Sequence, residues 1–93
     1  MDNLEEIIEI FAKTTDAKQM RKLLTEIFTP AELEDVSKRW FFMKELYRGV
    51  PQRKIAKDME IGLCKITRGS KILKDPDSQF ARILGEMYDE DHI

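Results

Sequence analysis

The chain contains too little of several residue types to carry some common kinds of protein chemistry. Among its 93 residues there is one cysteine, Cys64, and one histidine, His92. A lone cysteine cannot form an internal disulfide, which fits a reducing cytoplasm, and the pair offers no ligand spacing for a zinc site. No nucleophile stands beside a candidate base, and the histidine falls in an acidic terminal segment. The sequence therefore argues against an enzyme.

Long apolar segments are also missing. No apolar run approaches the roughly 18–20 residues that span a membrane. The first residues, MDNLEEIIEIF, are acidic and lack the basic region and cleavage site of a signal peptide. We therefore expect a cytoplasmic protein with no membrane partner. A chain of this length is one domain whose core alone is marginal, and dimerisation is a common remedy.

Alternation of polar and apolar residues is absent as well, whereas apolar residues recur at helical spacing almost throughout the chain. The sequence predicts an all-α fold of six helices and no sheet. Asp16 is placed to cap the second helix. Thr29, Pro30 and Glu32 form the start signal of a long third helix that stops at Gly49. The remaining helices are expected at about 51–59, at 63–73 and after the interruption at 75–78.

The apolar surface of the third helix is wider than a single seam. Trp40 and Met43 belong to a stripe at helical spacing, and Phe41 and Phe42 extend that stripe sideways. A helix that is apolar on more than one side must be covered on more than one side. This pattern indicates a second subunit.

Residues 51–74 are typical of a helix-turn-helix. A small Ala56 in the first helix, Gly62 in the turn and Ile66 in the second helix suit this motif, which places a helix in the DNA major groove. The second helix is expected to face the core with Leu63, Ile66 and Leu73. Glu60 stands where the turn glycine is usual, and a positive φ there costs about 1–2 kcal/mol unless the turn differs. The plainer alternative is a helical hairpin with a solvated charged face.

Charge is strongly segregated along the chain. Residues 38–74 hold 11 Lys or Arg and 3 Asp or Glu, a net charge of +8. Residues 1–37 and 75–93 each carry a net charge of −5, so a nearly neutral chain contains a strongly basic middle. Phosphate binding depends on the local field, so this pattern favours double-stranded DNA as a partner.

Several stretches of the chain resemble the Trp repressor family, the tryptophan-dependent bacterial transcriptional regulators. QRKIA at 52–56 and ITRGS at 66–70 resemble its helix-turn-helix. The stretch from Leu24 to Trp40 resembles the segment that leads into its long central helix, and ELYRG at 45–49 resembles the end of that helix. The similarity covers about 23–74, and it is more specific for fold and DNA binding than for ligand.

The resemblance implies an intertwined homodimer that represses transcription by binding a palindromic operator. Residues 1–48 would form dimerisation-core helices, 51–74 the helix-turn-helix reading head and 77–89 a C-terminal core helix. Gln52 and Arg53 would begin the first head helix, with Arg53 reaching a guanine edge. The other expected DNA contacts are Leu63, Cys64, Lys65, Thr67, Lys71 and Lys74, the last two on phosphates.

The family also binds tryptophan as a corepressor between core and head, and no other cofactor is expected. By resemblance, Arg39 and Arg68 would sandwich the indole ring. Thr29 and Arg68 would hold the carboxylate, Gly69 would leave room for the ring, and backbone carbonyls around 26–28 would take the ammonium group. Ile72 stands where the family has a serine, which removes one polar partner of the ammonium group.

Other departures leave several interpretations open. The linker at Val50 and Pro51 is one residue shorter than in the family, and Lys65 and Ala56 replace a threonine and a lysine, so base preference is expected to differ. The ligand is L-tryptophan, another small molecule or none. A dimeric protein-interaction module that does not read DNA is the alternative from a different class.

Overall fold

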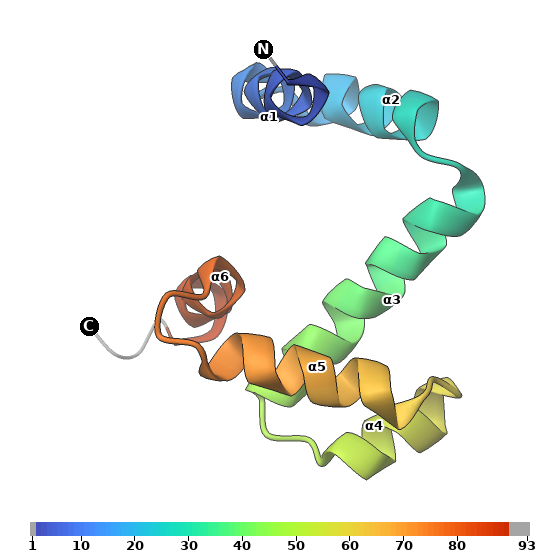
Figure 1. The fold of residues 1–93 in the computed structure, drawn as a ribbon, viewed down its shortest axis with the longest axis vertical. Coiled ribbons are helices and arrows are strands. Elements are labelled where there is room, and N and C mark those ends of the chain that lie inside the picture. The colour runs from blue at the N-terminus through green and yellow to red at the C-terminus, as the bar shows by residue number, and fades with distance from the viewer. Residues whose placement is uncertain (1, 90–93) are drawn as a thin grey trace. The chain divides into compact units, whose positions relative to one another are not determined.

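Six α-helices make up the fold. The computed structural model describes residues 2–89, and Figure 1 shows the helices α1 (Asn3–Lys13), α2 (Ala17–Ile27), α3 (Pro30–Tyr47), α4 (Gln52–Met59), α5 (Leu63–Lys74) and α6 (Gln79–Tyr88). No strand occurs among residues 2–89, so the predicted all-α fold is confirmed. The expected position of His92 in a terminal tail lies outside the described residues. Between residues 2 and 89 no helix has the length and apolar character to cross a membrane.

Side-chain caps explain the starts of four of the six helices, α1, α2, α3 and α6. Asp2, Asp16 and Ser78 precede α1, α2 and α6, and each side chain accepts a backbone N–H of the first turn at 2.9–3.0 Å. At α3 the cap is reciprocal. Thr29 Oγ1 accepts from the N–H of Glu32 at 3.1 Å, and Glu32 Oε1 accepts from the N–H of Thr29 at 2.9 Å. Both predicted caps, at Asp16 and Thr29, are confirmed, because each satisfies N–H groups that the helix itself leaves unpaired.

α3 and α4 end in the same backbone motif with different residues. After α3, Gly49 has a φ of 91°, and after α4, Glu60 has φ 55° and ψ 43°. In both cases the next N–H donates to the carbonyl five residues earlier at 3.0 Å. This is the Schellman arrangement, which requires a left-handed residue after the helix. Glu60 adopts the left-handed conformation although this brings its Cβ atom too close to the following carbonyl oxygen.

Replacing Glu60 by glycine is expected to stabilise the protein by roughly 0.5–1 kcal/mol. Relief of the left-handed strain should raise the free energy of unfolding by about 1–2 kcal/mol. The larger backbone entropy of glycine in the unfolded chain should lower it by about 0.5–1 kcal/mol. Urea denaturation at one protein concentration measures the difference. Glu60→Ala is the control, since it removes the same charge and keeps Cβ. Equal stabilisation by alanine would contradict the backbone explanation.

The chain forms two compact units, an N-terminal unit that ends at Val36 and a C-terminal unit that begins at Ser37. The N-terminal unit contains α1, α2 and the start of α3, and neither α1 nor α2 has a buried residue. The C-terminal unit contains the rest of α3 with α4, α5 and α6, around the buried side chains of Phe42, Met43, Ile55, Ile66 and Leu84. The roles predicted for 1–48, 51–74 and 77–89 stay predictions.

Aromatic contacts hold α6 in the C-terminal unit. Phe80 stacks on Trp40 with ring centroids 5.0 Å apart, and Tyr88 stacks on Tyr47 at 6.3 Å. Tyr47 also donates a hydrogen bond to the carboxylate of Asp89. That bond raises the pKa of Tyr47 above its ordinary value, because it favours the protonated phenol. These contacts join the end of α6 to α3, so α3 supports α6 as well as α5.

The prediction that Leu63 faces the core is wrong. Leu63, expected to face the core with Ile66 and Leu73, is 40% exposed, whereas Ile66 is fully buried and Leu73 packs against the core. Leu63 is the first residue of α5, and helical side chains tilt toward the N-terminus of their helix. Its side chain therefore extends past the packed surface, although its spacing from Ile66 suits a buried position.

Candidate DNA-binding face and ligand cavity

α4 and α5 pack together as the predicted helix-turn-helix, and Figure 1 shows them side by side. Ile55 of α4 and Ile66 of α5 are 3% and 0% exposed, and Ala56 packs against this core. The small side chain of Ala56 lets the two helices approach closely. The buried pair fixes the rotation of both helices, so their polar residues face outward.

The outward face of α5 carries a hollow of about 320 Å³. It is lined by Leu63, Cys64, Thr67, Arg68 and Lys71. All but Arg68 belong to the predicted DNA contacts, so the structure brings these predictions together. The hydroxyl of Thr67 also donates to Gln52 Oε1 at 3.0 Å, which ties α5 to the start of α4. This bond uses the carbonyl of Gln52 and leaves its amide hydrogens for a ligand.

The cations of this surface differ in their availability. Arg53, Lys71 and Lys74 are exposed, and within residues 2–89 they make no hydrogen bond or ion pair. Lys54 pairs with Asp58 at 2.8 Å, one helical turn later, and the hydrogen bond to that carboxylate raises the pKa of Lys54. Arg53, Lys71 and Lys74 therefore carry charges that a ligand can meet, whereas the charge of Lys54 is paired with Asp58.

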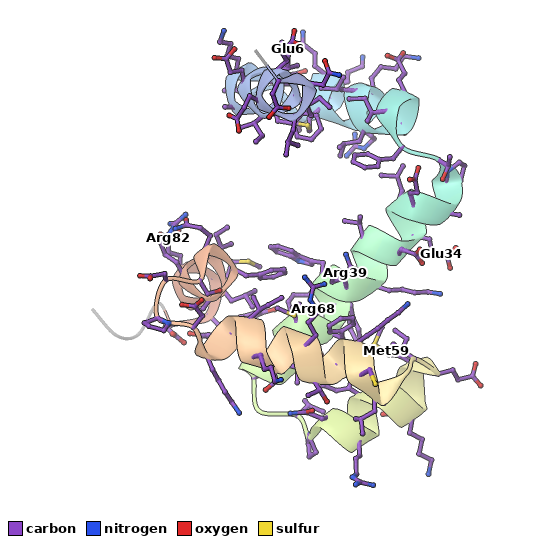
Figure 2. All side chains as sticks on the ribbon, viewed as in Figure 1. Glu6, Glu34, Arg39, Met59, Arg68 and Arg82 are labelled. Carbon is purple, nitrogen blue, oxygen red and sulfur yellow. The ribbon has the colours of Figure 1, made fainter. Side chains whose placement is uncertain are left out.

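A smaller cavity lies between α3, α5 and α6. It has a volume of about 90 Å³ and is lined by Arg39, Met43, Lys65, Arg68, Gly69, Ile72 and Phe80. Figure 2 shows the side chains of Arg39 and Arg68 near each other, one from α3 and one from α5. With Gly69 and Ile72, four of the five predicted ligand contacts line one cavity. Its volume is below the roughly 300–1,000 Å³ typical of sites that enclose a whole ligand.

Gly69 is a point of close approach between α5 and α3. A Cβ at this position would lie 2.7 Å from Met43 Sδ, 3.0 Å from Phe42 Cε1 and 3.2 Å from Leu46 Cδ1. A packed interior has no space for an atom at such distances. Gly69 therefore allows the two helices to pack, and its predicted contact with a ligand ring stays a prediction.

Thr29, the fifth predicted ligand contact, belongs to the N-terminal unit. Its Oγ1 accepts a hydrogen bond within the cap of α3, so its hydroxyl hydrogen stays available to an acceptor such as a carboxylate. The backbone N–H of Thr29, and then its hydroxyl, lower the pKa of Glu32, because both stabilise the ionised carboxylate. The capping role of Thr29 is confirmed, and its ligand role stays a prediction.

Sequence reasoning did not assign three residues to the small cavity. Lys65, predicted as a DNA contact, lines it, and so do Met43 and Phe80. Lys65, Arg68 and Ile72 follow one another at spacings of three and four in α5, so helical periodicity could have placed Lys65 beside the other two. Phe80 belongs to α6, which is separated from α5 by a loop, and no local sequence pattern predicts its position in the cavity.

Comparison with known proteins finds relatives of this chain. The family described as Trp repressor protein matches residues 2–88. A Trp operon repressor homolog of Vibrio parahaemolyticus serotype O3:K6 is 37% identical over 71 residues, which are 75% of this chain and 69% of the relative. A Trp operon repressor homolog of Chlamydia trachomatis serovar L2 is 31% identical over 90 residues, which are 90% of this chain and 96% of the relative. No solved structure gives a significant match.

The family match includes every residue of both candidate sites. It runs through α4 and α5 and continues past Phe80, the last lining residue of the small cavity. The Chlamydia relative aligns over nearly its whole length, so the similarity is not confined to the helix-turn-helix. The chain therefore belongs to the Trp repressor protein family and is a repressor-type transcription regulator, not an enzyme.

Proposed function

We propose that the chain is a homodimeric repressor that binds a palindromic operator in double-stranded DNA through α4 and α5. The observation that carries this proposal is the outward face of α5. There, cations without internal partners stand on a helix that the buried Ile66 fixes from behind. Such a face suits the major groove and its flanking phosphates. The names of the relatives, which refer to the Trp operon, support the same role.

We propose that a second copy of the chain covers the exposed apolar side chains of the N-terminal unit. Leu4, Ile8 and Ile27 expose 60%, 49% and 44% of their surface, and α1 and α2 bury no residue. A continuous exposed apolar surface marks an interaction site. A two-fold dimer carries two copies of the helix-turn-helix, which would meet two half-sites about one DNA turn apart.

L-tryptophan or a related small molecule is the proposed regulator. The planar guanidinium groups of Arg39 and Arg68 suit the two faces of an aromatic ring. The cavity is smaller than such a ligand needs, so it must widen or be completed by a second copy of the chain. Residues of α3, α5 and α6 all line it, so a ligand there favours one packing of α5 against its support. DNA affinity then depends on the ligand.

Arg53→Ala is expected to remove sequence discrimination. An operator is first selected from random palindromic duplexes, and binding to selected and scrambled duplexes is measured by fluorescence anisotropy. Loss of a bidentate contact to guanine should weaken binding to the selected duplex by roughly 1–3 kcal/mol and leave the scrambled duplex nearly unchanged.

Lys74→Ala is the matched control for Arg53→Ala. A contact to a phosphate does not distinguish one base from another, so this variant should lose similar affinity for both duplexes. The slope of log binding constant against log salt concentration should become shallower by about one. Equal losses on both duplexes for Arg53→Ala would remove its assigned role. If the unmodified protein binds neither duplex at low salt, with or without ligand, the chain is a protein-interaction module instead.

A further inference from the structure

The hydroxyl group of Thr67 already has a partner inside the molecule. It donates its hydrogen to Gln52 Oε1 at 3.0 Å, from α5 to the first residue of α4, and both side chains are half-buried. A hydroxyl group has one hydrogen to donate, and the phosphate oxygens of DNA accept hydrogen bonds. Thr67 therefore cannot donate to a phosphate while this bond is intact, although the sequence predicts it as a DNA contact.

The same bond orients the amide group of Gln52. Its carbonyl oxygen points toward α5, and within residues 2–89 its amide nitrogen makes no hydrogen bond. Glutamine recognises adenine with its oxygen and its nitrogen together, in one bidentate contact. Because Thr67 engages the oxygen of Gln52, the nitrogen alone is left for DNA, and it can only donate. A phosphate oxygen, which accepts from uncharged side chains as well as from cations, is the matching partner.

The start of α4 offers little else to hold this side chain. Pro51 precedes α4 and provides no side-chain hydrogen bond to it, and the first buried residue of the helix is Ile55, almost one turn later. An unrestrained glutamine has many rotamers, and ordering such a side chain during binding lowers the affinity. The bond from Thr67 restrains the side chain of Gln52 before DNA binds.

We propose that Thr67 is a positioning residue for DNA binding, which holds the amide group of Gln52 so that this group donates to a DNA phosphate. The inference rests on the DNA-binding function proposed above and deepens it. It assigns the DNA contact to Gln52 and gives the hydroxyl of Thr67 an indirect role. Because phosphates are the same in every sequence, the pair adds to affinity for all duplexes and not to discrimination between them.

A double-mutant cycle on the 93-residue protein tests this arrangement by fluorescence anisotropy. It uses the selected and scrambled duplexes at low salt, with and without L-tryptophan. Gln52→Ala should weaken binding to both duplexes by at least about tenfold, the loss of one hydrogen bond to a charged group. Thr67→Val should weaken both by about fivefold, the cost of ordering one free side chain. In the Gln52→Ala background, Thr67→Val should have no further effect.

Two further measurements distinguish positioning from a purely structural role. Thr67→Ser keeps the hydroxyl group and should restore binding to within about twofold of the starting protein. A series of selected duplexes, each with one phosphate replaced by an uncharged methylphosphonate, should locate the partner of Gln52. At that position the replacement should weaken the starting protein but not Gln52→Ala. Lys74→Ala should keep the full penalty there, because it removes a different contact.

Thr25→Val is the matched control for Thr67→Val. The hydroxyl of Thr25 also donates within the molecule, to the carbonyl of Lys22 at 2.8 Å, but Thr25 belongs to α2 in the N-terminal unit. The same exchange of a hydroxyl for a methyl group should leave binding to both duplexes within about twofold of the starting value. Circular dichroism of every variant verifies that the helices are retained.

Several outcomes would overturn the inference. Losses that multiply in the double variant, to about fiftyfold, would show that Thr67 contacts DNA by itself. A Thr67→Val variant that binds like the starting protein would show that no positioning is needed. A Gln52→Ala loss confined to the selected duplex would assign a base contact to Gln52. In all three cases the DNA-binding function would stand, whereas a starting protein that binds neither duplex would overturn that function and this inference together.

Discussion

Gly69→Ala is expected to lower the free energy of unfolding by about 2 kcal/mol, although alanine is the better helix former by about 1 kcal/mol. The added methyl group would meet Met43 Sδ at 2.7 Å, with Phe42 Cε1 at 3.0 Å and Leu46 Cδ1 at 3.2 Å. Met43 and Phe42 are 1% and 4% exposed, so neither can turn into solvent. The helix α5 must then move away from α3. Urea denaturation at a fixed protein concentration measures the loss.

Gly85→Ala provides a control with the opposite expected sign. Gly85 lies inside α6, and the nearest atoms to a Cβ there are Tyr47 Oη at 3.4 Å and Asp89 Oδ2 at 3.5 Å. These are ordinary contact distances, so the helix preference of alanine should dominate and stabilise the protein by roughly 0.5–1 kcal/mol. Two identical substitutions at helical glycines therefore differ in sign because of packing alone.

Met43→Ala, combined with Gly69→Ala, tests the proposed cause. Met43→Ala alone should cost about 2–5 kcal/mol, since it leaves a cavity. In that background the methyl group at position 69 has space, so most of its cost should disappear and a strong coupling should result. A Gly69→Ala variant as stable as the starting protein would show that α3 and α5 repack easily and that close approach at Gly69 is not required.

The features that the sequence predicted best depend on residues within one helical turn. The caps at Asp16 and Thr29 and the helix stop at Gly49 each follow from a few neighbouring residues. The sequence left two alternatives at Glu60, a positive φ or a different turn, and the structure has the positive φ. The pairing of Lys54 with Asp58 has the same local origin. A spacing of four residues in a helix predicts this pair. The net charge of +8 for residues 38–74 nevertheless includes Lys54 as if its charge were unpaired.

The parts that could not be predicted depend on contacts across the chain. The stacking of Phe80 on Trp40 and the place of Phe80 in the small cavity join α6 to α3. Periodicity identifies an apolar face and says nothing about its neighbour. Arg39 and Arg68 were paired by family resemblance alone, and the structure gives that pairing a shared cavity without testing the ligand.

Ile8→Glu is expected to raise the dissociation constant of the proposed homodimer at least about a hundredfold. Ile8 belongs to the apolar stripe of α1 with Leu4, Ile7 and Phe11, and it is 49% exposed in one chain. If a second copy covers this stripe, the variant buries an unpaired carboxylate, which costs roughly 3 kcal/mol or more. Sedimentation velocity over a range of concentrations measures the change.

Lys13→Gln is the matched control for Ile8→Glu. It makes the same change of one charge unit in α1, but Lys13 lies outside the apolar stripe. It should leave the dissociation constant within about threefold of its starting value, the scale of an exposed charge change. An Ile8→Glu variant that stays dimeric at the same concentrations would show that the α1 stripe is not the interface.

Ile8→Glu should also lose helix, and that loss would show that α1 and α2 depend on the proposed dimer for their helical structure. α1 and α2 have 11 residues each and bury none of them in a single chain. Isolated helices of fewer than about 12–15 residues are marginal in water, so packing against another surface must stabilise them. Glutamate is a better helix former than isoleucine. A fall in far-ultraviolet helicity on dilution of Ile8→Glu therefore cannot come from local preference, and it would indicate that α1 and α2 are helical because a second copy covers them.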